Sequence, residues 1–207
     1  QNQSVLYRKD ASGKEEVFLD PNTFSKDGST SLAGINFTQD GSLVAYQISE
    51  AGSDWRKVIV LNAVTKEKIG ETLVDVKFSG VSWYKNEGFY YSSYDKPTGS
   101  ELSAKTDQHK LYYHKLGTAQ SEDKVVFGGD IKRRYVGGSV TEDNLYLVIS
   151  AANATSSNEL YLVDLTQPKF EIKTLVDNMV YDYDIIDNRG SKLYVITNNN
   201  APNKKLM

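Results

Sequence analysis

The sequence contains no cysteine, and this absence excludes disulfide bonds and thiolate metal sites. No apolar run approaches the roughly 20 residues that a membrane-spanning helix needs. Lys and Arg total 24 and Asp and Glu total 27, spread along the whole chain. A phosphate-binding domain concentrates its basic residues on one face, and the one dense basic run, Lys132–Arg134, fits a solvated loop or strand end. We therefore expect neither a membrane nor a nucleic acid as partner.

The residues needed for acyl transfer are also missing. Hydrolases of this chemistry hold their nucleophile in a Gly-x-Ser-x-Gly elbow, and the nearest pentapeptide, Gly80–Tyr84, lacks the second glycine. The only two histidines, His109 and His114, flank a predicted strand, point to opposite faces and fit surface or hairpin positions. We expect no catalytic residue in this chain.

Three carboxylates near one another are the best candidates for a metal site. Asp182 and Asp184 share a strand face and Asp187 follows them, a spacing that loops for hard cations also use. The glycine and the late glutamate of a calcium loop do not fit. A set of hydrogen bonds between neighbouring units is the favoured interpretation, so we predict no metal and no cofactor.

What the sequence does contain is a fourfold repeat of an apolar stretch, a hairpin marker and an aromatic-rich stretch. The equivalent marker residues, Gly41, Gly88, Asn144 and Gly190, are 47, 56 and 46 residues apart. Gly and Asn at such positions supply the positive φ values of tight hairpins. Four strands in each repeat of this length are typical of a β-propeller blade. We predict an all-β fold of antiparallel four-stranded blades.

The phase of the repeat divides the chain into three whole blades and two half blades. The chain opens with the two outer strands of a blade and closes with two inner strands, so both ends look cut from a longer protein. The predicted units are an outer half blade over 1–20, blades over 35–74, 81–127 and 138–176, and an inner half blade over 183–207.

Several motifs carry a more specific signal. The most specific is His109–Thr118 followed by Gln120–Asp123. Further motifs are Asp20–Asn22, Ser49–Trp55 and Val76–Ser79. In order and spacing they resemble the propeller of the prolyl oligopeptidase family, above all its bacterial members, over essentially all 207 residues.

The resemblance implies a cytoplasmic or periplasmic serine peptidase that cuts short peptides after proline. In that family the Ser-Asp-His triad lies on a separate α/β-hydrolase domain, and a seven-bladed propeller caps it so that folded proteins are excluded. This chain would be a non-catalytic substrate gate. Its partners would be that catalytic domain and short proline-containing peptides. The alternative is a free-standing propeller that serves as a protein-interaction module.

The resemblance also implies a pocket wall for the substrate residue two before the proline. By motif position, Phe78 and Val136 match residues of that wall, and plain packing between blades is the alternative for both. Thr155 falls where mammalian members carry a cysteine, so the thiol sensitivity linked to that cysteine is not expected here.

The two half blades raise the question of closure, since open sheet edges promote association. One chain can close into a four-bladed ring, two chains can exchange halves in a homodimer, or the chain can stay an open arc. The gentle curvature of a seven-bladed parent favours the dimer or the arc.

Overall fold

The computed structural model describes residues 3–96 and 106–207, and strands dominate both ranges. The helical elements described there are two single turns of 3-10 helix, Pro21–Thr23 and Gln120–Glu122. Within the described ranges, no helix has the length and apolar character needed to cross a bilayer. The fold is therefore all-β, as the repeat predicts.

Three sheets of four antiparallel strands follow one another along the chain, each in the order in which the chain forms them. The first contains β3 (Thr30–Phe37), β4 (Leu43–Glu50), β5 (Trp55–Asn62) and β6 (Lys68–Lys77). The second contains β7 (Ser82–Tyr84), β8 (Gly88–Ser93), β9 (Lys110–Lys115) and β10 (Lys124–Phe127). The third contains β11 (Tyr135–Val140), β12 (Tyr146–Ala152), β13 (Glu159–Asp164) and β14 (Ile172–Val176).

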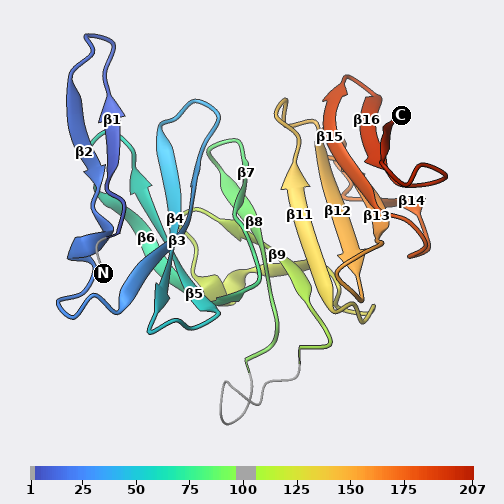
Figure 1. Cartoon of the computed structure of the whole chain (residues 1–207), viewed down its shortest axis with the longest axis horizontal. Coiled ribbons are helices and arrows are strands. Elements are labelled where there is room, and N and C mark those ends of the chain that lie inside the picture. Colours follow the sequence, from blue (N-terminus) through green and yellow to red (C-terminus); the bar gives the residue numbers. More distant parts are fainter. Residues whose placement is uncertain (1–2, 97–105) are drawn as a thin grey trace.

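Two partial sheets flank these blades. β1 (Leu6–Lys9) pairs with β2 (Glu15–Leu19) at the start, and β15 (Tyr183–Arg189), β16 (Lys192–Thr197) and the short β17 (Lys205–Leu206) form the last sheet. The partial sheets lie at opposite ends of the long axis in Figure 1, so the single chain is an open arc and not a four-bladed ring. The exchange of halves between two chains stays a prediction.

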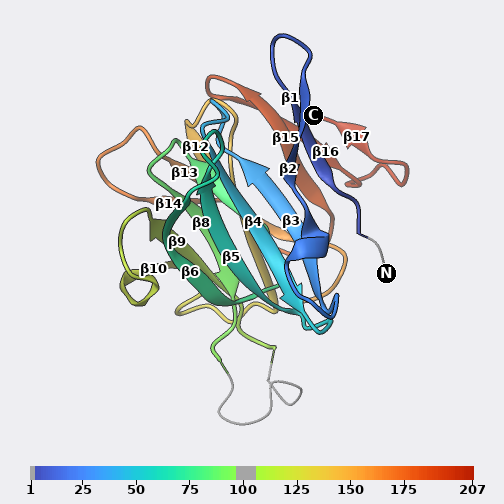
Figure 2. The ribbon, with the colours of Figure 1, turned by 90° about the vertical axis from the view of Figure 1, so that its left-hand side faces the viewer.

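The hydrophobic core lies between successive sheets, which stack face to face in Figure 2. Every residue of β8 is buried, because this strand is covered on both faces. Side chains of a strand alternate between its faces, so Phe89 joins the cluster shared with the first blade and Tyr90 the cluster shared with the third. The aromatic residues of the repeat therefore pack between blades.

The hairpin markers behave differently at one of the four positions. Gly41, Asn144 and Gly190 have φ values of 71°, 59° and 55°, as tight turns demand. Gly88 is outside this group, and the positive φ of its hairpin falls on Lys85 instead, at 50°. Gly88 starts β8, where a Cβ would lie 2.3 Å from the carbonyl oxygen of His114. Close approach of two strands is the reason for this glycine.

The basic run before β11 lies in a loop, as expected, with Lys132 and Arg134 exposed and Arg133 partly buried. Two of the three guanidinium nitrogens of Arg133, Nε and Nη2, donate to the carboxylate of Glu159, each at 2.7 Å. The Glu159 side chain is only 8% exposed and also accepts a hydrogen bond from the Tyr161 hydroxyl at 2.9 Å. A bidentate pair of this kind fixes the entry of the chain into the third blade.

Candidate functional site

The predicted wall residues lie at one end of the blades, which we call the lower rim. There β6, β8 and β12 end and β9 and β11 begin, at the bottom of Figure 1. Phe78 follows β6 directly, with a left-handed φ of 51° and a side chain left 44% exposed. A left-handed conformation is unusual for a bulky residue and is a mark of functional positions. It turns the Phe78 ring towards Tyr94, whose ring it meets edge-on at 6.2 Å between centroids.

His109 connects Phe78 with Val136. The imidazole is 1% exposed and stacks on the Tyr94 ring at 4.3 Å. Its Nε2 lies 2.9 Å from the carbonyl oxygen of Lys77 in the first blade, and its Nδ1 accepts the backbone N–H of Val136 in the third blade at 2.9 Å. These two partners require a neutral ring with the proton on Nε2. One side chain of the second blade thus links all three.

The three predicted residues differ in exposure. Val136 is 3% exposed, and its side chain packs in the core between the second and third blades. Thr155 lies in the exposed turn between β12 and β13. His109 links the carbonyl group of Lys77, next to Phe78, with the N–H of Val136, and Thr155 lies on the surface of the same rim. Their role as a wall stays a prediction.

Sequence reasoning missed His109 and Tyr94. A surface or hairpin position for either histidine was expected, and that expectation is wrong, because His109 and His114 are both buried. His109 directly precedes β9 and Tyr94 directly follows β8, and at such positions next to a strand the sequence pattern carries no sign of burial. Only the packing of three blades on one another encloses them.

His114 forms the second buried polar cluster. Its Nδ1 lies 2.8 Å from one carboxylate oxygen of Asp123, and the Tyr91 hydroxyl donates to the other at 2.8 Å. A His–Asp pair with a nucleophile is the pattern of acyl-transfer enzymes. Within the described ranges, neither histidine is hydrogen-bonded to a serine or threonine hydroxyl. The pair therefore stabilises the second blade and offers no nucleophile.

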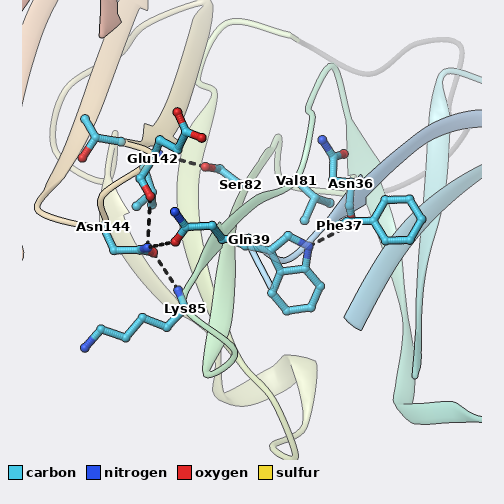
Figure 3. A pocket seen from close by; sticks show the side chains of 11 residues that line it. Asn36, Phe37, Gln39, Val81, Ser82, Lys85, Glu142 and Asn144 are labelled. Carbon is cyan, nitrogen blue, oxygen red and sulfur yellow. Dashed lines mark hydrogen bonds between the residues drawn. The ribbon is translucent and has the colours of Figure 1, made fainter. Parts of the chain in front are cut away.

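The opposite end of the blades, the upper rim, is formed by the hairpin turns after β3, β7, β11 and β15. A pocket of about 340 Å³ opens there between the first strands of three successive blades (Figure 3). The Asn144 amide donates to Gln39 Oε1 at 3.1 Å and its oxygen accepts the N–H of Lys85 at 2.9 Å. Turns of the first, second and third blades are thereby tied together.

Two carboxylates extend this chain of turns. Asn86 donates to Asp40 at 2.7 Å, and Asn188 donates to Asp143 at 2.6 Å, each across a blade boundary. The backbone N–H of Ser42, with Asn86 and two hydroxyls, holds the pKa of Asp40 well below its usual range. Hydrogen bonds from Thr141, Leu145 and Asn188 outweigh the effect of burial and lower the pKa of Asp143. Both groups are ionised acceptors at neutral pH.

One of the three carboxylates of the candidate metal cluster has a similar role. Asp182 accepts hydrogen bonds from the N–H of Ser157 at 2.6 Å and from Asn198 at 3.0 Å. The first joins the last sheet to the third blade, which is the inter-blade role favoured from the sequence. No group of three or more potential ligands for a metal ion occurs in 3–96 or 106–207.

Comparison with known proteins agrees with this architecture. The family described as the prolyl oligopeptidase N-terminal β-propeller domain matches residues 1–207. The chain is 57% identical to the prolyl endopeptidase of Elizabethkingia meningoseptica and 33% identical to prolyl oligopeptidase A of Amanita bisporigera. These matches cover 100% and 93% of this chain but only 30% and 28% of the relatives.

Solved structures agree as well. A prolyl endopeptidase from a study of inter-domain dynamics in catalysis and specificity superposes with a TM-score of 0.88 at 30% identity. Prolyl oligopeptidase B of Galerina marginata, bound to a 35mer substrate, gives 0.86 at 29% identity. Both matches cover the whole of this chain and about a third of the other, 30% and 32%. The chain belongs to the prolyl oligopeptidase family and corresponds to part of its N-terminal β-propeller domain.

Proposed function

We propose that this chain is the non-catalytic, substrate-gating propeller part of a serine-type prolyl endopeptidase, which hydrolyses short peptides on the carboxyl side of proline. The observation that carries the proposal is the family match over residues 1–207, together with a span of only 30% of the Elizabethkingia relative. The partners are then the α/β-hydrolase catalytic domain and short proline-containing peptides.

The lower rim supports the part of the proposal that concerns substrate. Phe78 presents a partly exposed ring whose direction is set by a left-handed backbone and by Tyr94. A ring fixed in this way offers an apolar wall to the substrate residue two before the proline. Val136 is buried between the second and third blades, and Thr155 lies in an exposed turn of the same rim. Burial of one apolar side chain against such a wall is worth about 1.5 to 3 kcal/mol.

The upper rim supports the part that concerns gating. Its turns are joined across blade boundaries, and the contact of Gln39 with Asn144 spans from the first whole blade to the third. In the proposed gate, such bonds would hold the turns close together, and a narrow opening admits an extended peptide more readily than a folded protein.

A chimera tests the proposed function. In it, this chain replaces the matching segment of the Elizabethkingia meningoseptica enzyme, with which it shares 57% of its residues. We expect the chimera to release the chromophore from a Gly-Pro substrate, and the isolated chain to show no turnover. Turnover by the isolated chain, or a folded chimera without activity on any short proline peptide, contradicts the proposal.

Substitution of Phe78 tests the wall. In the chimera, Phe78→Ala is expected to lower kcat/KM about tenfold for peptides with a large apolar residue two before the proline, since part of a hydrophobic pocket is lost. Peptides with glycine at that position provide the internal control and should change little. An equal loss for both peptides would assign Phe78 to packing between blades instead.

A further inference from the structure

Most of Lys77, the last residue of β6, is buried at the lower rim. Only 9% of the residue is exposed. Its ammonium lies 4.9 Å from the centre of the Trp55 ring and 5.2 Å from that of Phe78. A lysine side chain can bury its methylene groups while its ammonium group stays at the surface, and Lys77 Nζ is not among the buried polar atoms that lack a partner. The two aromatic rings attract the ammonium group but bring no negative charge.

Most other cations of the same rim have carboxylate partners, whereas Arg56 donates to Gln47 Oε1 at 3.1 Å. Arg134 is exposed to solvent and lies over the Tyr135 ring. The paired cations are Lys96 with Asp75 at 3.0 Å, Lys110 with Asp95 at 2.7 Å, Lys132 with Asp107 at 3.8 Å and Arg133 with Glu159 at 2.7 Å. In the described part of the chain, the Lys77 ammonium by contrast has no carboxylate within 4.0 Å.

A second donor beside Lys77 also lacks an acceptor. The indole Nε1 of Trp55 is buried and has no hydrogen-bond partner among the residues described. The other tryptophan shows the usual arrangement, since Trp83 Nε1 donates to the carbonyl oxygen of Asn36 at 3.0 Å. Ammonium and indole N–H groups only donate. Among the residues described, this corner of the rim therefore has hydrogen-bond donors and a positive charge but no carboxylate that pairs with Lys77.

We propose that Lys77, between Trp55 and Phe78, recognises a carboxylate side chain of a peptide bound at the lower rim. The inference rests on the proposed function, because Phe78 is the predicted wall of the pocket for the residue two before the proline. A Glu or Asp at that position would lay its methylene groups on the Phe78 ring and its carboxylate at the Lys77 ammonium. A compact ammonium accepts a carboxylate in many orientations, so both acidic residues fit.

Steady-state kinetics of the chimera test this preference. Two peptides identical except for Glu or Gln two residues before the proline are compared, and kcat/KM is expected to be about tenfold higher for Glu. Lys77→Met should bring the ratio to one and Lys77→Arg should retain part of it. Lys96→Met is the matched control and should leave the ratio unchanged.

The outcomes separate the two proposals. Activity on the Gln peptide reports the proposed function by itself, and its absence from a folded chimera counts against that function. Equal kcat/KM for Glu and Gln peptides, or a ratio that survives Lys77→Met, overturns the role of Lys77.

Binding to the 207-residue chain provides a test that needs no catalysis. The chain has two tryptophans, so its ¹⁵N spectrum holds two indole signals, which Trp55→Phe assigns. Titration with the Glu peptide should move the Trp55 signal saturably in the millimolar range and leave that of Trp83 in place. The Gln peptide and Lys77→Met should abolish the shift, while an unmoved Trp83 signal reports an intact fold. A Trp55 signal that does not shift with the Glu peptide, or that shifts equally with both peptides, refutes the site.

Discussion

Replacing His109 with alanine is expected to lower the free energy of unfolding of the chain by about 3 kcal/mol. The ring is 1% exposed and joins three blades through Lys77, Tyr94 and the N–H of Val136. Its removal leaves a cavity at the blade boundary, and it leaves a buried carbonyl oxygen and a buried N–H without partners. Urea denaturation of the 207-residue chain measures the loss.

Lys132→Ala is the control for this substitution. The Lys132 side chain is 71% exposed on the same rim, and its removal should change the free energy of unfolding by less than about 0.5 kcal/mol. Equal stability of His109→Ala and the unmodified chain would show that the bridge between blades contributes nothing.

The same ring makes stability depend on pH. Burial lowers the pKa of His109 to about 4, although its hydrogen bond to the carbonyl oxygen of Lys77 acts in the opposite direction. The histidine of an unfolded chain has a pKa of about 6.5, so between these values the unfolded state binds more protons. The stabilisation by the neutral ring is complete above pH 6.5 and decreases as the pH falls through 4, by up to about 3 kcal/mol.

Denaturation midpoints between pH 4.5 and 7.5 check this dependence. His109→Gln keeps a polar group in place without a proton to bind in this range, and its midpoint should vary less with pH. The lowered pKa values of Asp40 and Asp143 act in a separate window, below about pH 4, where unfolded aspartates take up protons. Parallel pH profiles for the two proteins would exclude His109 as the source.

Gly88→Ala is expected to lower the free energy of unfolding by about 3 kcal/mol. A Cβ at this position would lie 2.3 Å from the carbonyl oxygen of His114 and 2.7 Å from the hydroxyl of Tyr113. The first of these atoms belongs to the backbone of β9, so β8 and β9 must separate. Both strands line the core between blades, and the loss should appear as a lower thermal midpoint.

Gly80→Ala is the matched control. A Cβ there meets no atom within 4 Å, and the backbone of Gly80 is not left-handed. Alanine should leave stability unchanged or raise it by about 0.4 to 1 kcal/mol, because it restricts the unfolded chain. A thermal midpoint for Gly88→Ala equal to that of Gly80→Ala would contradict the close approach of β8 and β9.

Much of the fold could be predicted from local pattern. The spacing of Gly41, Gly88, Asn144 and Gly190 indicated the repeat, and alternation within short apolar stretches indicated strands. Tight turns and the alternation of side chains along a strand both depend on backbone geometry within a few residues. For that reason a single sequence is enough to predict them. The last sheet shows the limit, because the two residues of β17 are too few for any pattern to reveal.

The site was less accessible to sequence reasoning. Motif resemblance supplied the three candidates Phe78, Val136 and Thr155. The motifs did not show that Phe78 is 44% exposed, that Val136 is 3% exposed or that Thr155 lies in an exposed turn. His109 was expected at the surface, yet three blades enclose it. Burial of a residue next to a strand end depends on which other blade covers it, and that is a property of tertiary packing.

The sequence by itself determined that this chain is a run of propeller blades without a Gly-x-Ser-x-Gly elbow, because hairpin chemistry and strand alternation are local. Tertiary structure alone decided that the chain is an open arc, that His109 ties three blades together and that Lys77 lies between two aromatic rings. Each of these depends on residues from different strands or blades coming within a few ångströms, and the order of residues along the chain does not encode such distances directly.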